Sequence, residues 1–92
     1  MLYNKEQCKE IKNYLDNSKC ARCFSSEELT LDHIIPISFL MQNFGASKEE
    51  TYDWDNFQPL CRKCNTLKAG RFDLSNEKTK KLLLKYIEIY CK

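Results

Sequence analysis

The clearest pattern of hydrophobic and polar positions lies near the C-terminus. Apolar and aromatic side chains recur there at helical spacing, at Thr79, Leu82, Leu83, Tyr86, Ile87 and Tyr90. This pattern predicts an amphipathic helix over about 75–91, with its apolar stripe turned to a core. Asp73 or Ser75 is the expected N-cap.

A second helix is predicted at the N-terminus. Asn4 is followed three residues later by Gln7, which is the spacing of a capping box. One face then carries apolar or weakly polar side chains, namely Cys8, Ile11, Tyr14 and Leu15. The polar run 16–18 ends the helix.

Two short strands are predicted between these helices. Leu29–Ile35 is rich in β-branched and apolar residues and is stopped by Pro36, and Phe57–Leu60 has a similar character. Helices and strands mixed in this order predict an α+β fold.

The remaining segments read as short helices and loop. Residues 37–47 predict a short apolar helix ending at Gly45, and residues 61–70 a helix closed by Gly70. The acidic stretch 49–55 is expected to be loop.

Composition limits the class of protein. A chain of 92 residues with 42% hydrophobic and 12% aromatic residues is expected to form one globular domain, 1–92. Its apolar runs are too short for a membrane span, and its N-terminus turns charged at once. We therefore expect a cytoplasmic protein with no membrane partner.

Charge is distributed unevenly along the chain. Residues 1–60 carry 6 basic and 10 acidic side chains, a net charge of −4, whereas residues 61–92 carry 9 and 3, a net charge of +6. A basic C-terminal third suits a polyanion contact, although a solvated helix face accounts for it equally well.

Four of the six cysteines form two C-x2-C pairs, Cys20 with Cys23 and Cys61 with Cys64. Two such pairs complete a tetrahedral zinc shell. A redox pair and disulfides are the alternatives. The first usually has a single motif in a βαβ setting, and a reducing compartment disfavours the second. We expect Cys8 and Cys91 to be buried thiols outside the shell.

The segment between the cysteine pairs resembles the HNH endonuclease family. The resemblance is carried by LDHIIP at 31–36 and by DNFQPLCRKCNTLKAG at 55–70, and the motif core covers 20–71. It implies a ββα-metal (His-Me finger) domain with a four-cysteine zinc site, flanked here by N- and C-terminal helices. The histidine common at position 65 in this family is asparagine in this chain, a form that the endonuclease VII type also has.

The same resemblance implies roles for individual residues. His33, the only histidine, would be the general base, and Asn56 would hydrogen-bond backbone across the hairpin and hold the histidine's loop. Asp32 and Asn65 would be ligands of a catalytic Mg²⁺ or Mn²⁺, since both offer hard oxygen atoms. Phosphate contacts would come from the basic residues Arg62, Lys63, Lys68 and Arg71.

The resulting hypothesis is a metal-dependent endonuclease that hydrolyses DNA phosphodiesters to 3′-hydroxyl and 5′-phosphate ends. An imidazole suits proton abstraction from water, because its unperturbed pKa is about 6.5. Two alternatives stay open: a non-catalytic zinc module that binds nucleic acid, and a structure-specific junction resolvase. DNA is the expected partner. A homodimer or a larger phage or restriction complex is also open, and the setting expected from the family is a phage or mobile element.

Overall fold

A computed structural model describes residues 2–91 and divides into two compact units. Unit 1 contains the chain up to Asp32 together with Phe57–Ala69. Unit 2 contains His33–Asn56 and the chain from Gly70 onward. The chain thus passes between the units three times. The expectation of one domain stays a prediction, and each unit is described by itself.

Unit 1 is built on a two-stranded sheet of β1, Leu29–His33, and β2, Phe57–Cys61. Hydrogen bonds connect residue 28 to 62, 30 to 60 and 32 to 58. Partner numbers fall along β2 as they rise along β1, so the strands are antiparallel. Alternate residues of a strand share a face, which puts Thr30 and Asp32 on one side of β1.

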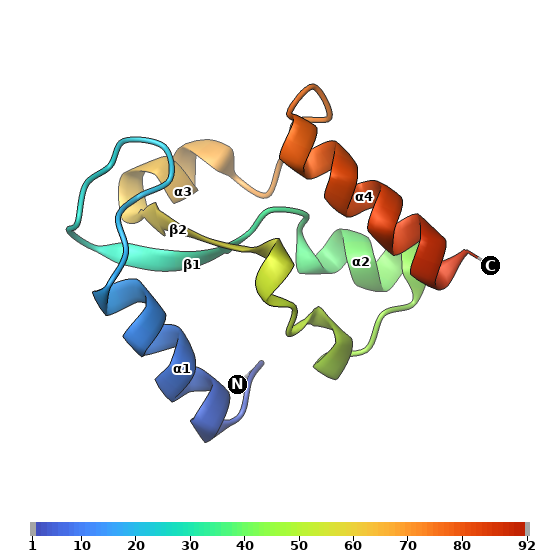
Figure 1. Cartoon of the computed structure of the whole chain (residues 1–92), viewed down its shortest axis with the longest axis horizontal. Coiled ribbons are helices and arrows are strands. Elements are labelled where there is room, and N and C mark those ends of the chain that lie inside the picture. The colour runs from blue at the N-terminus through green and yellow to red at the C-terminus, as the bar shows by residue number, and fades with distance from the viewer. Residues whose placement is uncertain (1, 92) are drawn as a thin grey trace. The chain divides into compact units, whose positions relative to one another are not determined.

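Two helices belong to unit 1. Helix α3, Arg62–Lys68, follows β2 directly and packs against it (Figure 1). Helix α1, Lys5–Asp16, begins with the expected capping box between Asn4 and Gln7. The buried cluster of this unit consists of three cysteines and Leu60, with Leu29 packed against it. Because much of this small core is thiol, a metal that binds the thiols would also stabilise the fold.

Unit 2 contains α2, Ile37–Phe44, and α4, Glu77–Tyr90, which lie side by side in Figure 1. Two short 3-10 turns, Glu49–Thr51 and Trp54–Asn56, occupy the stretch expected to be loop. A buried apolar cluster joins the helices, consisting of Ile34, Ile35, Leu40, Ala46, Leu82 and Tyr86. Most of the C-terminal stripe therefore is a core face, as its periodicity predicted, but the prediction was wrong for Ile87, which is 41% exposed.

The ends of the helices follow local chemistry, with one correction. Helix α2 ends at Gly45 with φ 67, as expected for glycine at a left-handed C-cap. The cap predicted for α4 was wrong, because Asn76 accepts hydrogen bonds from the backbone of Lys78 and Thr79. Asp73 instead accepts from the backbone and hydroxyl of Ser75, forming a turn just before the helix.

Candidate metal centres

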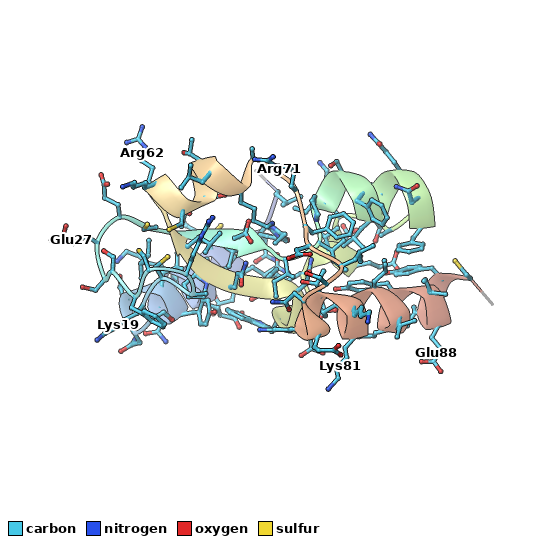
Figure 2. All side chains as sticks on the ribbon, turned by 90° about the horizontal axis from the view of Figure 1, so that it is seen from above. Lys19, Glu27, Arg62, Arg71, Lys81 and Glu88 are labelled. Atoms are coloured by element: carbon cyan, nitrogen blue, oxygen red, sulfur yellow. The ribbon has the colours of Figure 1, made fainter. Side chains whose placement is uncertain are left out.

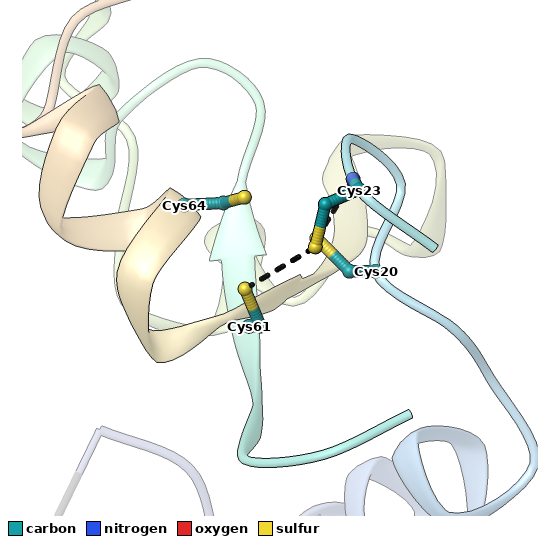
Figure 3. Close-up of side chains that lie close together, drawn as sticks. All are labelled: Cys20, Cys23, Cys61 and Cys64. Carbon is teal, nitrogen blue, oxygen red and sulfur yellow. Dashed lines mark hydrogen bonds between the residues drawn. The ribbon is translucent and has the colours of Figure 1, made fainter. Parts of the chain in front are cut away.

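The four paired cysteines converge in unit 1. Figure 3 shows Cys20 and Cys23 from the loop after α1 facing Cys61 at the end of β2 and Cys64 on α3. Their sulfur atoms all lie within 4.8 Å of one another. Tetrahedral zinc with Zn–S bonds of about 2.3 Å needs sulfur atoms roughly 3.8 Å apart. The donor set and its spacing therefore fit zinc.

None of these sulfur atoms forms a disulfide. All six cysteines are free thiols, and Sγ of Cys23 lies 3.6 Å from Sγ of Cys61, whereas a disulfide bond needs about 2.05 Å. The expected burial of Cys91 was wrong, since it is exposed at the end of α4, and Cys8 is half-buried. Neither thiol belongs to the sulfur cluster.

The surroundings of the cluster favour a thiolate at Cys20. Burial raises the pKa of this thiol, but hydrogen bonds from the backbone of Cys23, Cys61 and Arg22 and from the Cys23 thiol outweigh burial and lower the pKa to about 6. Burial raises the pKa of Cys64, and hydrogen bonds with its sulfur neighbours raise it further. Four close thiols repel one another when ionised, so a divalent cation is what allows all of them to be thiolates.

A second group of polar side chains in unit 1 surrounds Asp32, which is 7% exposed. The Gln58 amide nitrogen donates to Oδ2 of Asp32 at 2.8 Å. The Lys68 ammonium lies 3.1 Å from Oδ1 and 3.1 Å from Oδ2. The carboxylate is thus held by an amide from β2 and a cation from α3.

Asn65 lies on the same face of α3 as Lys68, three residues away. Its Nδ2 donates at 2.8 Å to the hydroxyl of Thr30, and this hydroxyl donates at 2.8 Å to the carbonyl of Leu60. Two contacts, Asn65 with Thr30 and Lys68 with Asp32, therefore join one face of β1 to one face of α3. The hydrogen bond uses the amide nitrogen of Asn65, so its amide oxygen is the atom that would contact a cation.

Asp32 and Asn65 stay candidate ligands of the expected hard cation, with the Lys68 ammonium in contact with both oxygens of Asp32. Asp32 and Asn65 occupy facing surfaces of β1 and α3, and they offer carboxylate and amide oxygen atoms, the donors that Mg²⁺ and Mn²⁺ prefer. Sequence reasoning missed Thr30 and Gln58. The position of Thr30, two residues before Asp32, was a usable signal, because alternate strand residues share a face.

The other two residues assigned to catalysis belong to unit 2. Asn56 is fully buried, and its side chain accepts from the Ile35 amide at 2.8 Å and donates to the Ile35 carbonyl at 2.9 Å. Its backbone carbonyl accepts from Ile34 at 2.8 Å. These bonds fix the bend after β1, which is the structural part of its expected role. His33 is the last residue of β1 and is half-buried.

The residues expected to contact phosphate differ in exposure. Arg62 and Lys63 on α3 are exposed, and the Arg62 side chain extends away from the helix (Figure 2). Arg71, in unit 2, is exposed as well. Lys68 is half-buried in its ion pair with Asp32, so its setting is unlike that of the other three.

Comparison with known families identifies the segment that contains the sulfur cluster and the residues around Asp32. The model of the HNH endonuclease family matches residues 19–71, which is more than half of the chain. The chain belongs to the HNH endonuclease family. No curated protein and no solved structure shows a significant match to it.

Membership of the HNH family agrees with the architecture. The matched segment contains both strands, α3 and all four cysteines of the sulfur cluster. A small mixed domain with a four-cysteine cluster fits an HNH-type α+β fold. Among residues 2–91, no helix combines the length and the apolar character that crossing a bilayer requires. Family membership points to nuclease activity or nucleic-acid binding.

Proposed function

We propose that this protein is a metal-dependent endonuclease that hydrolyses DNA phosphodiester bonds. The observation that carries the proposal is the HNH match over residues 19–71, together with the facing positions of Asp32 and Asn65 in unit 1. A bound Mg²⁺ or Mn²⁺ would stabilise charge on the phosphate and on the leaving oxygen. Asp32 and Asn65 would hold this ion.

His33 is proposed as the general base. The neutral imidazole accepts a proton from water while the water oxygen attacks phosphorus, and the bond between phosphorus and the 3′-oxygen breaks. The leaving oxygen takes a proton from solvent, which gives a 3′-hydroxyl and a 5′-phosphate. Asn56 supports this step by fixing the backbone at Ile35, two residues after His33.

Zinc on the four cysteines is proposed to be structural. Four thiolate ligands fill a tetrahedral shell, so this centre has no open position for water or phosphate. Arg62, Lys63 and Arg71 are exposed cations suited to backbone phosphates. Lys68 was assigned the same role from sequence, and its different setting is taken up below.

The decisive experiment measures cleavage of supercoiled plasmid and of a branched junction by zinc-loaded protein. Mg²⁺ or Mn²⁺ is added or omitted, because a chelator would strip the zinc as well. His33→Ala is expected to keep its zinc and bind DNA, but to cleave about 10² to 10⁴ times more slowly, the usual contribution of a positioned base. The variant, purified in parallel, also controls for contaminating nucleases.

Other outcomes have equally definite meanings. Wild-type cleavage rates in His33→Ala would remove His33 from the mechanism. A protein that binds DNA but cleaves neither substrate with either ion would be a non-catalytic zinc module. Cleavage of the junction alone would identify a resolvase.

A further inference from the structure

The ion pair between Lys68 and Asp32 occupies the edge of the carboxylate where a cation binds most strongly. The ammonium lies 3.1 Å from each oxygen and therefore straddles the two of them. The two side chains are only 16% and 8% exposed. Limited exposure reduces screening by solvent, which makes this contact stronger than an ordinary surface ion pair.

A divalent cation on Asp32 and the ammonium of Lys68 would repel each other at this distance. Both favour the same carboxylate edge, and like charges a few ångströms apart are costly in a partly buried place. One must leave when the other binds. The long flexible stem of lysine allows this movement without a shift of the backbone.

We propose that Lys68 is a built-in competitor of the divalent cation at Asp32. Its ammonium holds the carboxylate until the ion binds, and is then displaced and free to contact a DNA phosphate. The inference rests on the proposed function only in assigning the ion to Asp32. It explains why one of four basic residues in this region is withdrawn into the site while Arg62 and Lys63 are exposed.

Gln58 keeps the Asp32 carboxylate oriented while the cation replaces the ammonium of Lys68. It donates to Oδ2 of Asp32 from β2, independently of α3. When the ammonium leaves, this hydrogen bond still orients the carboxylate. Lys68 is the last residue of α3, and the helix ends there because Ala69 and Gly70 both adopt left-handed backbone, with φ of 49 and 75. No further turn of α3 follows Lys68, so its side chain has room to move away from Asp32.

The test measures Mn²⁺ binding to zinc-loaded protein without DNA, from loss of the electron paramagnetic resonance signal of free Mn²⁺. Lys68→Gln is expected to bind Mn²⁺ roughly tenfold more tightly than the wild type, within the range usual for two coupled ligands. Lys63→Gln removes the same charge from the same helix at an exposed position and is expected to change the affinity less than about twofold, since exposed charges are well screened.

A second measurement uses the wild-type protein alone and so does not depend on folding of the variant. Acylation of individual lysines by a mild reagent is followed by mass spectrometry, with and without saturating Mn²⁺. The ion-paired Lys68 is expected to react slowly at first and several times faster with Mn²⁺. Lys63 is expected to react at the same rate in both conditions.

Several results would overturn the inference. Lys68 does not compete with the ion if Lys68→Gln binds Mn²⁺ no more tightly than the wild type. The same conclusion follows if Mn²⁺ does not change the acylation rate of Lys68. If such a protein still cleaved DNA with Mn²⁺, only the inference would fall. If wild type and Lys68→Gln both bound no Mn²⁺, the inference and the proposed ion at Asp32 would fall together. If Lys68→Gln bound Mn²⁺ and the wild type did not, the inference would be supported, because Lys68 would then exclude the ion completely in the absence of DNA.

Discussion

At the scale of single residues, the hydroxyl of Thr30 determines which atom Asn65 presents. The hydroxyl donates to the Leu60 carbonyl, so its lone pairs accept from the Asn65 amide nitrogen. This bond selects one of the two orientations of the amide and points its oxygen away from Thr30. If Asn65 binds the proposed ion, Thr30 is the group that orients this ligand, and loss of such a group usually weakens metal binding.

Replacement of Thr30 tests this positioning role. Thr30→Val keeps the branched shape but loses the hydroxyl, so the Asn65 amide can rotate. We expect Mn²⁺ affinity to fall about 10- to 100-fold, the usual effect of losing such a partner. Thr30→Ser keeps the hydroxyl and should restore most of the affinity. The measurement is the same titration of free Mn²⁺, with zinc content as the check on folding.

A purely structural role for Thr30 would give a different result. Both variants would then lose thermal stability, and the Mn²⁺ affinity of the folded protein would not distinguish serine from valine.

At the scale of elements, a network of charges ties the 3-10 turn at Trp54–Asn56 and the residue before it to α4 within unit 2. Lys85 donates to Asp53 at 2.8 Å and to Asp55 at 2.9 Å, and the Tyr86 hydroxyl donates to Asp53 at 2.7 Å. Burial raises the pKa of Asp53, but these donors outweigh it and leave the pKa below its ordinary value. The network therefore stabilises the form of unit 2 in which Asp53 is ionised.

This network predicts a loss of stability in acid. A carboxyl group with a lowered pKa in the folded state contributes its full stability above its unfolded pKa of about 3.9, and loses it as the pH falls through the folded value. Asp53→Asn should lower the free energy of unfolding by about 1 kcal/mol at pH 7 and by less at pH 3. Urea unfolding at both pH values measures this.

Asp55→Asn is the matched control, because Asp55 contacts the same lysine but its side chain is 71% exposed. We expect it to change the free energy of unfolding by less than about 0.5 kcal/mol. Equal losses in the two variants, or a loss in Asp53→Asn that does not depend on pH, would contradict the role assigned to Asp53.

Elements were predictable from sequence where one local signal was dominant. The capping box at Asn4, the glycine after α2 and the stripe of α4 each had a single strong reading, and each is confirmed except for Ile87 in the stripe. The start of α4 was ambiguous because Asp73, Ser75 and Asn76 are all good caps. The choice depends on the turn that Asp73 makes with Ser75, which sequence spacing does not specify.

The positions of Asp32 and Asn65 in the candidate site were predictable only from the family resemblance. The grouping of four cysteines follows from their spacing, and the structure confirms it. The partners of Asp32 and Asn65 depend on the register of β1 against β2 and on which face of α3 meets the sheet. The contacts of Gln58 and Lys68 with Asp32 are products of that register, so only the folded chain reveals them.

At the scale of the whole molecule, the chain order of the cysteine pairs has the largest consequence. The first pair precedes β1 and the second follows β2, so 37 residues separate Cys23 from Cys61. A metal that joins the pairs closes this loop. By the loop-closure relation used for disulfides, such a link would disfavour the unfolded chain by about 4 kcal/mol.

Because zinc would join the two cysteine pairs, we expect the chain to tolerate a break between them. Ser47 and Lys48 are exposed and lie within the loop that the metal closes. Two half-chains, 1–47 and 48–92, would each carry one cysteine pair and one strand of the sheet. We expect them to assemble when co-expressed, to co-purify with one zinc per pair of fragments, and to separate in a strong chelator.

Separation of the fragments while zinc is present would show that the cysteines do not bridge them. Persistence of the pair in chelator would assign the association to the sheet or to the apolar cluster that joins α2 to α4. If zinc bridges the fragments, the fold can be reassembled from two separate chains. Neither fragment contains both Asp32 and Asn65, so the proposed cleavage of DNA would require both fragments and would respond to the supply of zinc.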